Sequence, residues 1–284
     1  MPRKKIDSRL GELIRKGVSS GFDLGVPVIV NKDRIRKLAN ARGLRKFSTD
    51  AKSTATIRKS PAVSIVDPPD VVGTVEETTI TGIRIGDTWS AEFNSLEDHR
   101  KEICECQNCP LGATRTNFVY GVGNPNADLM FIGEAPGKNE DEQGEPFVGR
   151  AGKLLDKILA AIDFKREDVF IANILKCRPP ANRDPLPAEM EECFPYLREQ
   201  IALVKPLIIC ALGRIAAQGL LDTKTPVGKL RGQWHSYQGV PLRVTYHPAA
   251  LLRNPAFKAG CWEDVQIIRA EYERLTENAA QTLN

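Results

Sequence analysis

Four short apolar runs, separated by helix-like segments, dominate the second half of the 284-residue chain. The runs lie at 128–133, 168–175, 207–213 and 242–246, and the helical patterns lie at 149–161, 187–204 and 214–221. Continuous apolar runs of this length are typical of strands buried on both faces. Because such strands alternate with helices, we expect an α/β fold: a three-layer α/β/α sandwich with a mostly parallel four-stranded sheet. A last helical pattern at 262–276 follows the sheet.

Charge divides the chain into an N-terminal segment and a globular region. Residues 1–60 hold 16 Lys and Arg against 5 Asp and Glu, whereas the remainder holds 24 against 31. Short apolar stretches broken by prolines predict little regular structure before residue 90. We therefore expect a basic, largely disordered extension at 1–90, a folded domain at 96–276 and a tail at 277–284. The extension either attracts nucleic acid or solubilises the chain.

The composition disfavours membrane and secreted proteins. No apolar run approaches the roughly 20 residues that a membrane helix needs. The basic residues 1–5 are not followed by the apolar stretch of a secretory signal. We therefore expect a cytoplasmic, monomeric protein that contacts no membrane.

Seven cysteines make an odd number, which favours metal ligation over a disulfide framework in a chain without an export signal. Cys106 and Cys109 are separated by two residues, so both thiolates can reach one metal centre. Cys177 and Cys193 are separated by 15 residues, which matches neither a zinc ribbon nor a ferredoxin pattern. The spacing alone leaves a zinc site and a [4Fe–4S] cluster open. Cys104 competes with Cys106 for the place of the first ligand.

Polar and aromatic side chains occur where the apolar runs end. Glu134 follows the first run, Asn173 lies inside the second, and His247 follows the last. Phe147 lies in a turn just before the first helical pattern. Ligands of parallel α/β proteins bind at the carboxyl ends of the strands. A buried amide such as Asn173 needs hydrogen-bond partners, which either a ligand or the backbone supplies.

Four motifs, in the same order, resemble those of the family 4 uracil-DNA glycosylases, which carry an iron–sulfur cluster. The motifs are Gly-Glu-Ala-Pro-Gly at 133–137, Pro-Phe-Val-Gly-Arg-Ala-Gly at 146–152, Lys-Cys-Arg-Pro-Pro at 176–180 and Tyr-His-Pro-Ala-Ala-Leu-Leu-Arg at 246–253. The resemblance covers about residues 106–262 and implies the same sandwich fold. It also implies a structural [4Fe–4S] cluster, whose ligands match Cys106, Cys109, Cys177 and Cys193.

The resemblance implies an enzyme that rotates uracil out of DNA into a pocket and hydrolyses its N-glycosidic bond. Gly133 and Phe147 then enclose the base, and stacking on the ring contributes about 1–3 kcal/mol. Asn173 pairs with uracil N3–H and O4, where cytosine presents the opposite pattern. His247 faces uracil O2 and stabilises the departing anion. Glu134 stabilises the sugar cation or orients the attacking water.

The segment after His247 is implied to enter the DNA. Leu251 is the expected wedge that fills the vacated stack, and Arg253 is an expected DNA contact. The chain departs from other uracil glycosylases at Ala135, where some carry an aspartate, and at Gly137, where some carry a tyrosine that excludes thymine. No lysine occupies a pocket motif, so a lyase step is not expected.

These observations favour a monofunctional uracil-DNA glycosylase that leaves an abasic site during base excision repair. Residues 228–235 lack the inserted basic loop by which a related branch traps the base-free sugar covalently, so turnover by hydrolysis is expected. Two alternatives stay open. One is a non-catalytic iron–sulfur DNA-binding module associated with replication machinery. The other is a zinc-containing nucleotide hydrolase on the same sheet, which would lack the brown colour of a cluster.

Overall fold

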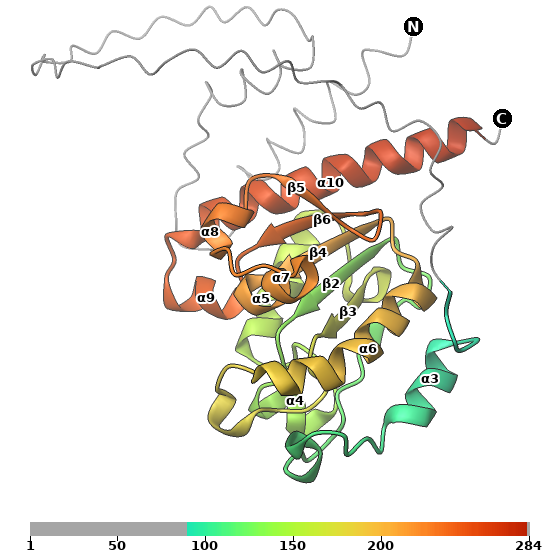
Figure 1. Ribbon diagram of the computed structural model, residues 1–284. Helices are drawn as coiled ribbons and strands as arrows, with labels where there is room; N and C mark the ends of the chain where they lie inside the picture. Colours follow the sequence, from blue (N-terminus) through green and yellow to red (C-terminus); the bar gives the residue numbers. More distant parts are fainter. Residues whose placement is uncertain (1–89, 283–284) are drawn as a thin grey trace, which may run out of the picture. The chain divides into compact units, whose positions relative to one another are not determined.

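The computed structural model of the chain describes residues 90–282, so the expected extension at 1–90 lies outside the described residues apart from Ser90. Six strands in this range form one sheet (Figure 1): β1 Val122–Gly123, β2 Leu129–Gly133, β3 Phe170–Asn173, β4 Ile208–Leu212, β5 Trp234–Tyr237 and β6 Val240–Thr245. Their spatial order is β1-β3-β2-β4-β6-β5. The four inner strands run parallel and correspond to the four apolar runs, as predicted.

The two edge strands correct the expected count of four strands. β1 pairs antiparallel with β3 over two residues, and β5 pairs antiparallel with β6. β5 is partly exposed and carries polar side chains, so it lacks the apolar run by which the inner strands were recognised. It joins β6 through Gln238 and Gly239, whose φ angles of 48° and 87° are those that a two-residue hairpin turn requires. The sheet is therefore mixed, with a parallel centre and antiparallel edges.

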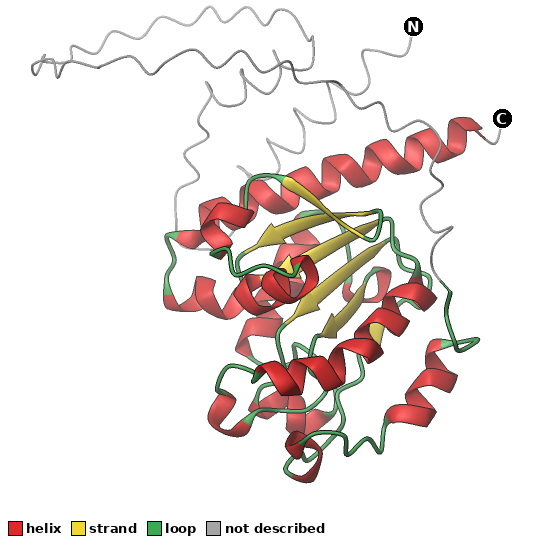
Figure 2. Cartoon of the chain, in the orientation of Figure 1, coloured by secondary structure: helices red, strands yellow, loops and turns green. Residues whose placement is uncertain are grey.

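Helices cover both faces of the sheet, as Figures 1 and 2 show. Four of them form the outer layers: α5 Arg150–Ala161, α6 Pro187–Val204, α7 Gly213–Leu221 and α10 Phe257–Thr282. Met130 and Ile132 of β2 pack in the core beneath α6 and α7. Leu129 and Phe131 pack in the core beneath α5 and α10, because successive strand side chains point to opposite faces. The expected three-layer sandwich is confirmed.

The terminal helix is longer than the sequence pattern indicated. It spans Phe257–Thr282 rather than 262–276, so it includes most of the residues expected to form a tail. Shorter helices and 3₁₀ turns connect the main elements: α3 Leu96–Ile103, η1 Pro110–Ala113, α4 Lys138–Gln143, η2 Arg166–Asp168, η3 Pro180–Asn182, α8 Val227–Leu230 and α9 Pro248–Arg253. None of the helices within residues 90–282 is long and apolar enough to cross a membrane.

The parallel strands all end at the same edge of the sheet. β2 ends at Gly133 directly opposite the end of β3 at Asn173, and the next pair of neighbours ends at Leu212 and Thr245. Segments that follow parallel strands meet at this edge, where α/β proteins bind ligands. Glu134 and His247 come from two of these segments, as the sequence predicted.

Candidate active site and cysteine pocket

Three of the predicted pocket residues meet at the ends of β2 and β3. A Cβ atom at Gly133 would lie 2.4 Å from Asn173 Oδ1 and 2.6 Å from Phe147 Cζ. Both distances are far below van der Waals contact, so only glycine lets the amide and the ring approach the same strand end. The structure therefore brings Gly133, Phe147 and Asn173 together.

Asn173 has an unsatisfied hydrogen-bond donor. Asn173 is 2% exposed, and its Nδ2 has no hydrogen-bond partner among residues 90–282. A buried amide without a partner costs about 1–3 kcal/mol, and such groups are uncommon in folded proteins. An unpaired donor at the ligand-binding edge of the sheet is suited to a hydrogen-bond acceptor on a ligand.

The backbone of Phe147 is strained, and its neighbours hold it in place. Its φ of 55° lies in the left-handed region, which is unfavourable for an aromatic residue. Arg166 donates to the Phe147 carbonyl at 3.2 Å, and the next two backbone N–H groups donate to Glu140 Oε1 at 3.0 and 2.9 Å. A Cβ at Gly152 would lie only 1.7 Å from the Phe147 carbonyl oxygen, so this position also requires glycine. The turn thereby fixes the ring beside Asn173.

His247 lies beside Phe147, on the side of the last inner strand. Its ring lies 5.5 Å from the Phe147 ring, with the two planes inclined by 31°. The backbone N–H of Ala249 donates to His247 Nδ1 at 3.1 Å, which places the proton of the neutral ring on Nε2. Burial, assisted by the charge of Arg253, lowers the pKa of His247 to about 4. At neutral pH the side chain is therefore an uncharged Nε2–H donor.

Glu134 follows β2 directly and is half-buried. Burial raises the pKa of its carboxyl group, and the nearby Asp184 carboxylate adds to this effect. The charges of Arg214 and Arg253 act in the opposite direction. The carboxyl group thus lies within reach of charges from three separate segments at the edge of the sheet.

Leu251, the expected wedge, lies in the core of the structure. Residues 248–253 form the short helix α9, with Pro248 at its first position. Neighbouring positions of a helix point about 100° apart. Leu251 consequently faces the core and is 1% exposed, whereas Leu252 is 40% exposed. Of the two leucines of α9, Leu252 is therefore the one exposed at the surface.

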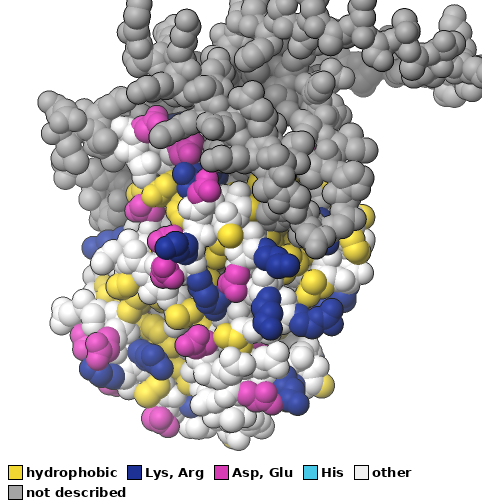
Figure 3. Space-filling view, turned by 180° about the vertical axis from the view of Figure 1, so that it is seen from behind, with side chains coloured by type: hydrophobic (Ala, Val, Ile, Leu, Met, Phe, Trp, Pro, Cys, Tyr) yellow, Lys and Arg dark blue, Asp and Glu magenta, His cyan; other side chains and the backbone are white. Residues whose placement is uncertain are grey.

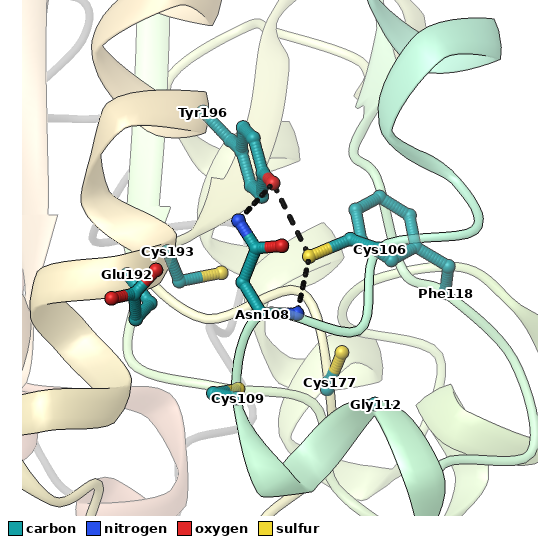
Figure 4. A pocket seen from close by; sticks show the side chains of 9 residues that line it. All are labelled: Cys106, Asn108, Cys109, Gly112, Phe118, Cys177, Glu192, Cys193 and Tyr196. Atoms are coloured by element: carbon teal, nitrogen blue, oxygen red, sulfur yellow. Dashed lines mark hydrogen bonds between the residues drawn. The ribbon is translucent and has the colours of Figure 1, made fainter.

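The four cysteines expected as ligands line one pocket. Figure 4 shows them around the same space, with Cys193 supplied by α6 and Cys106 by the segment after α3. Cys104 is not among the lining residues, and its thiol points to the Lys101 carbonyl at 3.4 Å. This arrangement supports Cys106 over Cys104 as the first ligand. No three His, Cys, Asp or Glu side chains in the described part of the chain are grouped closely enough to hold a single metal ion.

Hydrogen-bond donors surround the sulfur atoms of this pocket. Tyr196 Oη donates to Cys106 Sγ at 3.2 Å, the Lys176 backbone N–H to Cys193 Sγ at 3.3 Å, and Arg115 to Cys177 Sγ at 3.5 Å. Burial raises the pKa of the Cys177 thiol and raises that of Cys193 to about 12. Thiolates at these positions therefore need a cation, and the donors around them suit the sulfur ligands of an iron–sulfur cluster.

The residues that support the candidate site leave no signal in the sequence. Arg166 and Glu140 act through backbone groups, which leave no pattern in the sequence. Lys176 was noted only as part of a motif, yet it is completely buried and its ammonium is 2.7 Å from the carbonyl oxygen of Asn173. A lysine in a sequence ordinarily indicates a solvated surface, so its burial gave no signal.

Comparison of the sequence with known proteins identifies the family of this chain. The Uracil DNA glycosylase superfamily matches residues 120–266. The chain is 48% identical over 174 residues to a type-4 uracil-DNA glycosylase of Archaeoglobus fulgidus. This alignment covers 58% of this chain and 87% of that protein. It is 43% and 46% identical, over 186 residues each, to the type-4 uracil-DNA glycosylases of Sulfurisphaera tokodaii and Saccharolobus solfataricus. These alignments cover 62% of this chain and 84% and 86% of the two relatives. The chain belongs to the uracil-DNA glycosylase superfamily and, within it, to the type-4 uracil-DNA glycosylases.

Proposed function

We propose that the protein is a monofunctional uracil-DNA glycosylase. It flips uracil out of DNA, hydrolyses the N-glycosidic bond and leaves an abasic site for base excision repair. The observation that carries this proposal is the unpaired Nδ2 donor of buried Asn173, which lies beside the Phe147 ring and the bare Cα of Gly133. An extruded base in this position would supply the missing acceptor.

Base recognition follows from the two faces of this pocket. The side-chain amide of Asn173 reads the base edge: its Nδ2 donates to uracil O4, and its Oδ1 accepts from uracil N3–H. Cytosine presents an amino group and an unprotonated ring nitrogen at these atoms, so both bonds are lost. Each mismatched buried group costs about 1–3 kcal/mol. Phe147 stacks on the face of the base without distinguishing between bases.

His247 stabilises the leaving group. As the glycosidic bond breaks, negative charge develops on uracil O2, and the neutral Nε2–H of His247 donates to it. A fixed donor of this kind contributes about 3–4 kcal/mol in comparable oxyanion sites. The Ala249 N–H bond to Nδ1 holds the ring in the required tautomer before the base arrives.

Glu134 acts on the sugar and the water, and the exposed end of α9 contacts the DNA. The Glu134 carboxylate stabilises the positively charged sugar and orients the attacking water. Leu252 is the exposed apolar side chain that fills the gap left by the base, and the exposed Arg253 contacts the DNA backbone. On the described part of the face shown in Figure 3, basic and acidic side chains are intermingled, so charge does not mark this face as the DNA-binding surface.

The cysteine pocket fits a [4Fe–4S] cluster held by Cys106, Cys109, Cys177 and Cys193. When bound, the cluster supplies a rigid tie between the segment before β2 and the segments after β3. This tie connects the end of the base-reading strand to α3 and α6. The protein acts in the cytoplasm, where its other three cysteines, Cys104, Cys210 and Cys261, stay reduced.

Two other functions are less well supported. A non-catalytic DNA-binding module would keep the cysteine pocket but would have no use for the donor of Asn173 or the fixed tautomer of His247. A zinc-dependent nucleotide hydrolase would need an ion beside the pocket. The four cysteines lie instead around a separate space, beyond the end of β3.

Substitution of Asn173 tests the proposal. Asn173→Ala is expected to lower single-turnover release of uracil by about 10²–10³-fold, comparable with the loss of an oxyanion donor. Asn173→Asp is expected to gain activity on cytosine, because its carboxyl oxygens accept from the exocyclic amine. Asn126→Ala, on an exposed turn, is the matched control and is expected to behave as wild type. Wild-type release by Asn173→Ala would refute the recognition role.

A further inference from the structure

Lys176 is a buried cation outside the set of residues that bind the base or the cluster. Its side chain is 0% exposed. Among the described residues its ammonium makes no ion pair with a carboxylate, and both of its hydrogen bonds go to neutral oxygen atoms. Removing an ammonium from water is costly. Packing alone does not offset this cost.

The two hydrogen bonds of Lys176 join β3 to α6. Lys176 Nζ donates to the Asn173 carbonyl at 2.7 Å and to Gln200 Oε1 at 2.6 Å. Gln200 is itself 0% exposed, and its Nε2 donates to the Tyr120 carbonyl at 2.8 Å. Both ends of the Gln200 amide are thus engaged, which fixes the position of the lysine head group.

The carbonyl of Asn173 lies where the sheet offers it no partner. On the side of β3 away from β2, β1 pairs only with Phe170 and Ile171. Hydrogen bonds to β2 continue past this point through Ile174, whose N–H donates to the Gly133 carbonyl. Lys176 therefore replaces the missing strand neighbour at the peptide group whose side chain carries the unpaired Nδ2.

We propose that Lys176 is a positioning residue of the base pocket: held by Gln200, its ammonium fixes the carbonyl end of β3 and so aims the Asn173 amide at the base. This inference rests on the proposed function of Asn173. The same residue also touches the cysteine pocket, because its backbone N–H donates to Cys193 Sγ and Cys177 follows it in the chain. Negative charge on these two sulfur atoms, when they act as cluster ligands, would offset part of the cost of the buried ammonium.

A double-mutant cycle tests this role in the iron-loaded protein. Lys176→Met removes the N–H donors and the charge but keeps an unbranched side chain. It is expected to lower single-turnover uracil release about tenfold in the wild-type background. In the Asn173→Ala background the same change is expected to cost about twofold at most, because the group that it positions is gone. A lysine that only stabilises the fold would lower both backgrounds equally.

Iron content, a second variant and a control separate the possible outcomes. Lys176→Met is expected to keep the wild-type iron content, since its backbone N–H still binds Cys193 Sγ. If it loses iron, Gln200→Leu decides, because it removes the same brace without flanking a cluster ligand; we expect a several-fold loss with the same background dependence. Lys157→Met, on the exposed side of α5, is expected to change nothing.

Equal losses in both backgrounds, or no loss from either brace variant, would overturn the positioning role. Wild-type release by Asn173→Ala alone is a distinct result, since it would remove the recognition function on which the proposal depends.

Discussion

Substitution of Gly133, which has no side chain, tests the arrangement of the base-binding residues. In Gly133→Ala, the new Cβ would lie 2.4 Å from Asn173 Oδ1 and 2.6 Å from Phe147 Cζ. Favourable contacts lie near about 3.5 Å, so the methyl group overlaps each neighbour by about 1 Å. Asn173 and Phe147 are 2% and 5% exposed, and the Phe147 turn is held at positive φ, so neither withdraws freely. We expect a loss of stability of about 1–3 kcal/mol, typical of overpacking.

The effect on catalysis is expected to exceed the effect on folding. A displacement of about 1 Å in a positioning group lowers rates by about 100-fold, and Gly133→Ala displaces both the stacking ring and the base-reading amide. Single-turnover uracil release at saturating DNA measures this loss, and thermal unfolding and iron content show whether the protein stays folded. Gly228→Ala is the matched control, because a Cβ there meets nothing within 4 Å. A folded Gly133→Ala protein with near wild-type release would refute the placement of the base between these residues.

Three further predictions concern the wedge, the carboxylate and the cluster. Leu252→Ala is expected to lower uracil release from duplex DNA about tenfold with unchanged stability. Leu251→Ala is expected to cost about 2–5 kcal/mol of stability because it empties a core position. Thermal melts and duplex assays distinguish the two variants, and the reverse pattern would identify Leu251 as the wedge. The release rate is expected to fall as the pH drops through the raised pKa of Glu134, because the active form is the carboxylate; a pH profile in Glu134→Gln that keeps this acidic limb would exclude the assignment. Iron analysis of alanine variants is expected to show loss at Cys106, Cys109, Cys177 and Cys193 and full retention at Cys104, Cys210 and Cys261, and iron loss at Cys104 with Cys106 unaffected would move the first ligand.

The sequence was sufficient for the centre of the sheet and insufficient for its edges. The inner strands are buried on both faces, so their composition carries a continuous apolar signal. β5 presents one side to solvent, and β1 spans two residues, so neither leaves such a signal. The helix α9 was likewise missed because six residues are too few for a periodic pattern, and the phase of that helix is what placed Leu251 inside the core.

In the candidate site, the sequence predicted the residues at the strand ends but not the residues that support them. Strand ends marked Glu134, Asn173 and His247 as neighbours, since parallel strands end at one edge. The supports of the site act through carbonyl and N–H groups that any residue possesses. Arg166 beneath the Phe147 turn and Lys176 behind Asn173 therefore emerged only from the hydrogen bonds in the structure.

The most direct test of the central claim is base release by the wild-type, iron-loaded protein. An oligonucleotide with a single uracil is incubated with the protein and then treated with alkali, which cleaves any abasic site. We predict free uracil, strand cleavage at the uracil position only after alkali, and no covalent protein–DNA product, with an otherwise identical thymine oligonucleotide left intact. An intact uracil strand after alkali, despite binding of the DNA, would contradict the account and identify the chain as a binding module.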